Sequence, residues 1–263
     1  MLPHLSALAG SLHGSRSYEV TRKMTTAGFR VAAAVAAAVI TTILVLFGPS
    51  LGLPAAGRGP VNRVAAMITS TTYLPLIAAR VWQPVPGSSW QWQLSDLPVD
   101  ITVDAEVYDI DLFDNDTSVV AALHAAGRKV VCYLSAGSWE DWRPDADRFP
   151  PAVLGKDYAG WPGERWLDIR RLDLLAPIMR SRLDQCQAKG FDGVEPDNID
   201  GYTSDTGFHL TYHDQLVYNR WLAAEAHRRG LSIGLKNDPK QLADLLAYFD
   251  WALTEDCFAD DWC

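Results

Sequence analysis

Three segments of this 263-residue chain repeat one order of elements: an amphipathic helical stretch, a glycine, and a short apolar strand. A glycine just after the last helical residue tolerates the left-handed conformation of a helix C-cap. Strands that are apolar on both faces and alternate with helices predict a parallel sheet covered by helices. The three predicted units are 118–126, Gly127 and 129–135; 172–189, Gly190 and 191–197; and 214–229, Gly230 and 231–237.

Three more strands extend this pattern to six. A helix predicted to begin at Asp238-Pro239, with the aspartate as N-cap, leads to a strand at 251–253, and 90–94 and 103–110 are two further strands. A composition of 48% hydrophobic and 21% charged residues supports one large domain with a core. An α/β domain of this kind is a doubly wound sheet or a barrel. No Gly-x-Gly-x-x-Gly or Walker pattern follows a strand, which disfavours nucleotide binding.

The amino-terminal part of the chain reads as a targeting element. An uncharged, mostly apolar run at 31–47 follows several basic residues and precedes the small residues 55–57. This pattern predicts a secretory signal peptide within residues 1–57, with an uncleaved membrane anchor as the alternative. Residues 58–89 are expected to be a linker and 90–263 the folded domain. We therefore expect a secreted protein or, alternatively, a membrane-anchored one whose domain lies outside the cytoplasm.

Disulfide bonds form in the oxidising environment outside the cytoplasm, so the four cysteines of an exported domain are candidates for such bonds. The short acidic loop between Cys257 and Cys263 predicts a bridge between these two residues. Cys132 lies in a predicted strand and Cys186 in a predicted helix. For this second pair, a bridge and two buried free thiols both remain open.

The charge of the domain limits its partners. From Asp96 onward, the sequence contains 31 acidic and 16 basic residues, which gives a net charge of −15. A domain without a basic patch is not expected to bind nucleic acid, whereas a cationic partner suits it. One long predicted loop contains four tryptophans: Trp139, Trp142, Trp161 and Trp166. Because tryptophan side chains stack on sugar rings, these four predict a sugar-binding platform, with core packing as the alternative.

Polar residues come directly after the predicted strands. In a (β/α) barrel, the carboxyl ends of the strands carry the catalytic residues. Two carboxylates from separate strands are what glycoside hydrolysis requires, and Glu195, Asp197 and Glu255 supply them. Period-two alternation places Glu195 and Asp197 on the same face of their strand. Alternatively, these acids form a metal site or cap the following loop, although their spacing does not match an EF-hand.

Other catalytic patterns are missing from the sequence. His209 and His213 do not form the His-Glu-x-x-His pattern of a zinc enzyme, and no Gly-x-Ser-x-Gly elbow is present. We predict that the domain uses neither a metal nor a cofactor.

Read together, the strand ends resemble the motifs of glycoside hydrolase family 114 from about Trp90 to Cys263. The matching stretches are 109–114, 132–140, 166–170, 190–202, 234–238 and 251–258, although the family more often has Asn where Thr254 stands. The resemblance implies a (β/α)8 TIM barrel and a retaining endo-α-1,4-polygalactosaminidase acting on a cationic galactosamine polymer.

By this resemblance, Asp197 is the nucleophile and Glu255 the acid/base, with Glu195 as the alternative for either role. Ten further residues are expected to bind substrate: Asp109, Asp111, Tyr133, Ser135, Trp139, Asn198, Asp200, Tyr202, Lys236 and Asn237.

With six strands, the barrel would lack the seventh and eighth of the family. We therefore expect a truncated monomer whose edge strands, 90–94 and 251–253, are open and whose inward faces lack neighbours. Two other functions stay open: a catalytically inactive, sugar-binding fragment of such an enzyme, and a hydrolase of another class on the same fold.

Overall fold

The computed structural model describes residues 81–259 and 261. The predicted signal peptide or anchor at 1–57 and the predicted bridge partner Cys263 lie outside these residues. Within the described part of the chain, no helix has the length and apolar character needed to cross a membrane.

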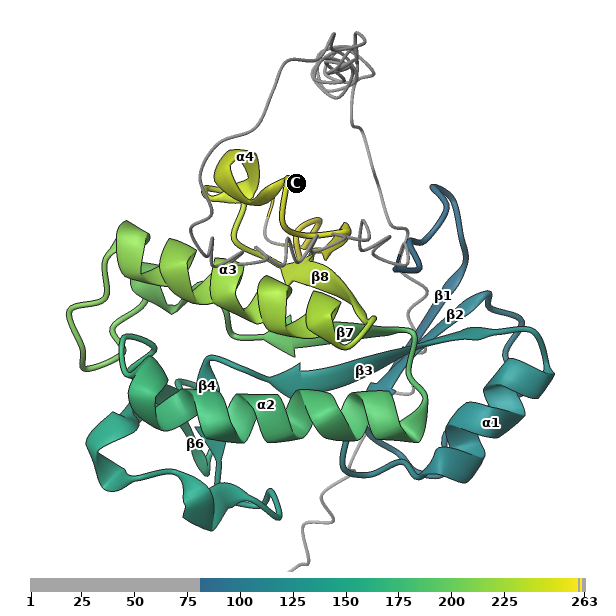
Figure 1. Ribbon diagram of the computed structural model, residues 1–263, viewed down its shortest axis with the longest axis horizontal. Coiled ribbons are helices and arrows are strands. Elements are labelled where there is room, and N and C mark those ends of the chain that lie inside the picture. The colour runs from purple at the N-terminus through teal and green to yellow at the C-terminus, as the bar shows by residue number, and fades with distance from the viewer. Residues whose placement is uncertain (1–80, 260, 262–263) are drawn as a thin grey trace, which may run out of the picture. The chain divides into compact units, whose positions relative to one another are not determined.

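Six parallel strands form a curled sheet, with its helices packed around it as an incomplete (β/α) barrel (Figure 1). The strands, in their order across the sheet, are β1 (Trp90–Gln93), β2 (Val107–Asp111), β3 (Lys129–Ser135), β7 (Gly193–Asp197), β8 (Ser232–Lys236) and β9 (Trp251–Leu253). The helices are α1 (Thr117–Ala125), α2 (Leu172–Lys189), α3 (Tyr212–Arg228) and α4 (Leu242–Leu245). The predicted six-strand barrel type is confirmed.

The repeated helix–glycine–strand pattern gives the predicted elements. Helix α2 and strands β3 and β9 begin and end at the predicted residues. Gly190 caps α2 in the left-handed conformation, with a φ of 91°. The pattern thus determines where each chain segment leaves a helix and enters the sheet.

The predicted helix start at Asp238-Pro239 is wrong. Helix α4 begins at Leu242, with Gln241 as its N-cap. Asp238 has a φ of 52°, and its carboxylate accepts hydrogen bonds from Tyr202 and Asn219. Asp238 is therefore in the left-handed region and not in the extended conformation typical of an N-cap residue, and the helix begins one turn later.

A second, antiparallel sheet lies within the segment expected to be a long loop between β3 and α2. Its strands run in the order β4 (Ser138–Glu140), β6 (Glu164–Leu167) and β5 (Leu154–Asp157), with the 3-10 turns Ala146–Arg148 and Pro151–Val153 between β4 and β5. The N–H of Leu167 donates to the carbonyl of Gly137 at 2.9 Å, so this sheet is attached to the end of β3.

Strands β1 and β9 are the two edges of the parallel sheet, as expected. The expectation that their inward faces lack neighbours is wrong for their two tryptophans. Trp90 and Trp251 contact each other, with ring centroids 5.2 Å apart, and both are buried. Trp82, from the stretch predicted as a linker, packs against the same cluster. The curl of the sheet therefore brings its first and last strands together through aromatic side chains.

Cys132 on β3 and Cys186 on α2 form a disulfide bond with an S–S distance of 2.12 Å. Of the two open alternatives for this pair, the structure has the bridge. It joins the centre of the parallel sheet to the helix that covers it.

Candidate active site

Neighbouring parallel strands end at the same edge of the sheet, and their last residues form one polar cluster. Lys236 is the final residue of β8, Asp197 is the final residue of β7, and Glu255 follows β9 by two residues. Glu195 lies two residues before Asp197, and both contact Lys236, as the predicted alternation requires. The structure therefore brings together all three predicted catalytic carboxylates.

The Lys236 ammonium is the centre of this cluster. Its Nζ lies 2.8 Å from Asp197 Oδ1, 3.1 Å from Glu195 Oε1 and 3.3 Å from Glu255 Oε2. The side chain is buried, which by itself would lower its pKa, but the surrounding carboxylates outweigh burial and raise the pKa well above its ordinary value. Lys236 is therefore a permanent cation at the edge of the sheet.

Asp197 receives three hydrogen bonds. Lys236 Nζ and the backbone N–H of Asn198 both donate to Oδ1 at 2.8 Å, and the Tyr133 hydroxyl donates to Oδ2 at 2.8 Å. Burial would raise the pKa of this carboxyl, but Lys236 and the other donors outweigh it and hold the pKa below its ordinary value. Asp197 is thus ionised, and Oδ2 is the oxygen with fewer donors.

Glu255 has a different environment. Of its side chain, 38% is exposed, and burial of the remainder raises its pKa although Lys236 opposes the shift. The backbone N–H of Glu255 donates to Asn237 Oδ1 at 3.0 Å, and Asn237 itself is in the left-handed conformation, with a φ of 52°. The two carboxylates that contact one lysine therefore have pKa values shifted in opposite directions.

Glu195 lies deeper than Asp197 and is completely buried. Trp92 Nε1 donates to its Oε2 at 3.0 Å. Next to it, burial and the charge of Glu195 raise the pKa of Asp109 well above its ordinary value, and no described residue donates to either oxygen of Asp109. Burial beside Glu195 thus disfavours the charged form of Asp109, while Glu195 contacts the Lys236 ammonium.

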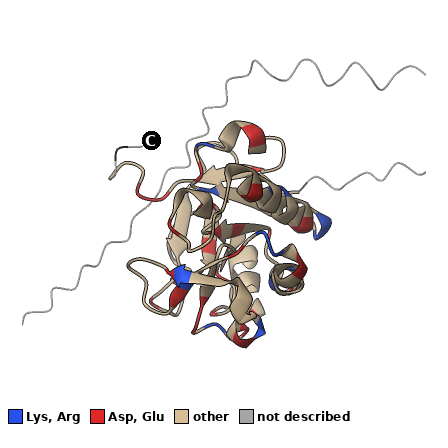
Figure 2. Ribbon diagram, turned by 90° about the vertical axis from the view of Figure 1, so that its left-hand side faces the viewer, with Lys and Arg blue, Asp and Glu red and all other residues tan. Residues whose placement is uncertain are grey.

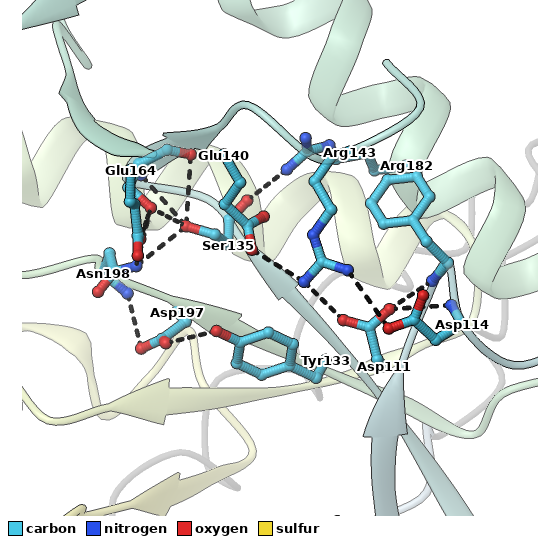
Figure 3. Close-up of polar contacts among 12 residues, drawn as sticks. Asp111, Asp114, Tyr133, Ser135, Glu140, Arg143, Glu164, Arg182, Asp197 and Asn198 are labelled. Atoms are coloured by element: carbon cyan, nitrogen blue, oxygen red, sulfur yellow. Dashed lines mark hydrogen bonds and ion pairs between the residues drawn. The ribbon is translucent and has the colours of Figure 1, made fainter. Parts of the chain in front are cut away.

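Asn198 links the cluster around Lys236 to the antiparallel sheet (Figure 3). Its Nδ2 donates to Glu164 Oε1 at 3.0 Å, to Ser138 Oγ at 2.9 Å and to Ser135 Oγ at 3.0 Å. The Ser138 hydroxyl also donates to Glu164 Oε1. These four residues form a closed set of hydrogen bonds directly beside Asp197.

Three of the predicted substrate-binding residues, Asp111, Trp139 and Tyr202, contact residues outside the Lys236 cluster. Asp111 forms a buried ion pair with Arg143, whose Nη2 lies 2.7 Å from Asp111 Oδ2. Trp139 Nε1 donates to the carbonyl of Ala146 at 3.0 Å. Tyr202 donates to Asp238 Oδ1 at 3.0 Å, while burial and the neighbouring Asp197 raise the pKa of Asp200. Asp111 and Trp139 are thus engaged outside the Lys236 cluster.

The four tryptophans of the predicted sugar platform do not share one environment. Trp142 and Trp161 are 51% and 61% exposed. Trp166 is buried and stacks on Tyr158 with ring centroids 4.5 Å apart, and Trp139 packs against the core. Only Trp142 and Trp161 have large exposed faces.

Three residues of this region were not predicted from the sequence: Trp92, Ser138 and Glu164. Trp92 belongs to a predicted strand, but nothing in its neighbourhood indicates a partner on β7. Glu164 stands alone among glycine, arginine and tryptophan in a segment expected to be a loop. Their roles depend on contacts between segments far apart in the sequence.

A small, open hollow lies beside Glu255. It is lined by Trp90, Trp92, Leu253, Thr254 and Glu255. Over residues 81–259 and 261, no group of three or more His, Cys, Asp or Glu side chains is arranged to hold a metal ion.

Comparison with known proteins finds similar solved structures. The chain is similar to Ega3 of Aspergillus fumigatus, solved in complex with galactosamine, at 48% identity and a TM-score of 0.67 over 69% of this chain and 72% of that one. A lower similarity, 16% identity and a TM-score of 0.49 over 63% of this chain and 65% of the other, links it to the glycoside hydrolase domain of PelA from Pseudomonas aeruginosa.

A third similarity is to an uncharacterized protein of Deinococcus radiodurans, 34% identical over 106 residues. The match covers 37% of this chain and 34% of that protein, so the chain matches about a third of the length of this curated relative. The model of the glycoside-hydrolase family GH114 matches residues 71–263, which include every residue of the Lys236 cluster. This protein therefore belongs to glycoside hydrolase family 114.

Proposed function

We propose that this glycosidase cleaves α-1,4-linked galactosamine polymers by a retaining mechanism, with Asp197 as nucleophile and Glu255 as acid/base. One observation carries the assignment: two carboxylates contact the same lysine, but the pKa of Asp197 is lowered and that of Glu255 is raised. A nucleophile must be ionised and a general acid must hold its proton, so the two shifts match the two roles.

The short separation of the pair supports a retaining reaction. The nearest oxygens of Asp197 and Glu255 both contact Lys236 Nζ, at 2.8 and 3.3 Å, so they cannot lie further apart than these two distances combined. This limit on the nearest oxygens is compatible with a retaining pair, whose carboxyl groups lie roughly 5–5.5 Å apart. Asp197 is therefore close enough to bond directly to a sugar bound beside Glu255.

In the first step, Asp197 Oδ2 attacks the anomeric carbon and forms an ester bond. The bond from that carbon to the leaving oxygen breaks, and the leaving oxygen takes the proton of Glu255. In the second step, water attacks the same carbon and gives a proton to Glu255 while the ester bond to Asp197 breaks. Asp197 and Glu255 both return to their starting states.

Oδ2 suits the attack because of how the donors are distributed. Oδ1 already accepts from Lys236 and from the Asn198 backbone, whereas Oδ2 accepts only from Tyr133. The donors on Oδ1 fix the carboxylate, and Oδ2 keeps a lone pair for the sugar. Glu195 is completely buried behind Lys236, a position in which it stabilises the ammonium and does not meet substrate.

The charge of the domain favours a cationic polymer. Its excess of acidic over basic residues gives a net charge of −15 from Asp96 onward, and the charged positions are spread over its helices and loops (Figure 2). Galactosamine units without acetyl groups carry ammonium charges, which such a field attracts over long range. Trp92, which is half-buried beside Glu255, offers an apolar face to a sugar ring, whereas Trp90 is buried beneath it.

The test is hydrolysis of purified polygalactosamine, followed by release of reducing ends. We expect turnover by the natural chain, and a loss of several kcal/mol of transition-state stabilisation, more than about 10²-fold in kcat, for Asp197→Asn and Glu255→Gln. Asp157→Asn, which removes an exposed carboxylate from strand β5, is the matched control and should keep full activity. Turnover of Asp197→Asn at the natural rate, or binding of the polymer without hydrolysis by the natural chain, would contradict the proposal.

A further inference from the structure

Glu164 lies directly opposite another glutamate in the antiparallel sheet. The register of β4 and β6 pairs Glu140 with Glu164, and both side chains are buried. Like charges at paired positions destabilise a sheet unless each is compensated by its own partners. The way in which the two glutamates are compensated is therefore informative.

Among the residues that the structure describes, a cation pairs with Glu140 and none pairs with Glu164. Arg143 Nη2 lies 2.8 Å from Glu140 Oε1 and also pairs with Asp111 (Figure 3). Glu164 is held by neutral donors, the hydroxyl of Ser138 and the side-chain amide of Asn198. A buried carboxylate without a cation is costly, so its retention at this position points to a function beyond packing.

Asn198 connects Glu164 to Asp197. Its side chain donates to Glu164 Oε1 at 3.0 Å, and its backbone N–H donates to Asp197 Oδ1 at 2.8 Å. Asn198 adopts a φ of 62°, in the left-handed region, which needs support from its surroundings. Whatever fixes the Asn198 side chain thereby also fixes the peptide that holds the nucleophile.

We propose that Glu164 is a positioning residue for the nucleophile: its carboxylate anchors the side chain of Asn198 and thereby keeps the Asn198 N–H on Asp197 Oδ1. The inference rests on the proposed function, because it assigns Glu164 a part in the same reaction. Glu164 does not touch the reacting atoms. Its effect reaches Asp197 through a single residue, across the junction of the two sheets.

The titration of Glu164 provides a signal for testing this link. Burial raises its pKa to about 7, the nearby charges of Glu140 and Asp197 add to the shift, and Ser138 and Arg143 oppose it. Tyr158 also faces this group, and burial raises its own pKa to about 12, so it stays neutral. The anchor therefore changes its charge near pH 7, and with it the strength of its bond to Asn198.

The first test compares Glu164→Gln with the natural chain at pH 8. Glutamine keeps the shape and loses the charge, so we expect kcat to fall about 10-fold, with KM within about twofold. The Tm should be unchanged or higher, because a buried charge without a cation is removed. The proposal would be overturned if Tm and kcat of Glu164→Gln both fell, or if its kcat equalled that of the natural chain. Asp157→Asn, on the same sheet, is again the control for loss of a carboxylate.

The second test asks whether the effect passes through Asn198. Asn198→Gly removes the side chain and permits the left-handed backbone, so the peptide keeps its conformation. In this background, Glu164→Gln should change kcat by less than about twofold, since the intermediate residue is gone. A full 10-fold effect in the Asn198→Gly background would show that Glu164 acts by another route.

The third test needs no substrate and therefore remains valid if the proposed function fails. The backbone amide resonance of Asn198 is followed by NMR as the pH is raised through 7. In the natural chain it should show an inflection near pH 7, which Glu164→Gln abolishes. An inflection that persists in Glu164→Gln, or its absence from the natural chain, would overturn the link between Glu164 and Asn198.

Discussion

The hydroxyl of Tyr133 donates a hydrogen bond to Asp197 Oδ2 at 2.8 Å, from the neighbouring strand of the parallel sheet. Burial, and then the charge of Asp197, raise the pKa of Tyr133 well above its ordinary value. Tyr133 is therefore a neutral donor over the whole working range of pH. It orients the oxygen that we assign to the attack.

Removal of this hydroxyl tests its contribution. In Tyr133→Phe, Asp197 Oδ2 loses its donor, so we expect kcat to fall about 10-fold and the pKa of Asp197 to rise. The acid limb of the kcat profile should therefore move to higher pH. The measurement is kcat against pH for both proteins, and an acid limb at the natural position would show that this bond does not tune Asp197.

The pH dependence of the natural enzyme follows from the two shifted carboxyls. Because the pKa of Asp197 is lowered, activity should be lost on the acid side only below its ordinary value of 3.8. Because the pKa of Glu255 is raised above 4.5, the alkaline limb should lie above that value, as this residue loses its proton. The expected result is a bell-shaped profile of kcat/KM.

Glu255→Gln assigns the alkaline limb. With an aryl galactosaminide whose leaving group needs no proton, this variant should still react in the first step, and its rate should no longer fall as the pH rises. An alkaline limb that remains at the natural position with this substrate would assign the limb to another group.

Gly137 is required by a close approach of two backbones. A Cβ at this position would lie 1.7 Å from the carbonyl oxygen and 2.6 Å from the carbonyl carbon of Asn198. Gly137→Ala must therefore displace the peptide beside Asp197, and we expect it to lower both kcat and Tm. Gly127→Ala is the comparison, since Gly127 has a φ of 77° and open space around it, and it should cost only about 1 kcal/mol. Equal losses in the two variants, measured by thermal melting, would contradict the close-approach argument.

The disulfide between Cys132 and Cys186 closes a loop with a sequence separation of 54 residues. Constraint of the unfolded chain by a loop of this length contributes about 4 kcal/mol. The double substitution of both cysteines by alanine should lower the free energy of unfolding by an amount of this order, as measured by urea denaturation. A loss below about 1 kcal/mol would show that the bridge does not stabilise the fold.

The sequence predicts the parallel sheet well because its elements carry local signals. The residues of α2 fall between a turn and Gly190, and β9 is a short apolar run, so their limits are visible without the structure. Asp238-Pro239 carries an equally good local signal for a helix start. It fails because Asp238 adopts a left-handed φ of 52°, where its carboxylate accepts hydrogen bonds from Tyr202 and Asn219, residues distant in sequence.

The antiparallel sheet lacks such signals. Strand β4 has three residues and β6 four, too short for a period to appear. The roles of Glu140 and Glu164 arise only when these strands pair, and the link to Asp197 arises only when Asn198 adopts the left-handed conformation. The carboxylates that we propose as the catalytic pair could be identified from strand ends and family motifs, whereas Glu164, which we propose to position Asp197, could not.

The most direct test of the central assignment is to trap the covalent intermediate. The enzyme is incubated with a 5-fluoro galactosaminyl fluoride, in which fluorine slows both steps and the good leaving group restores the first. Peptide mapping by mass spectrometry then locates the sugar ester. With Asp197 as the nucleophile, we expect the label on Asp197, at the end of β7, and no label in Asp197→Asn. A label on Glu195 or Glu255, or unlabelled enzyme that hydrolyses the probe with inversion at the anomeric carbon, would contradict this assignment.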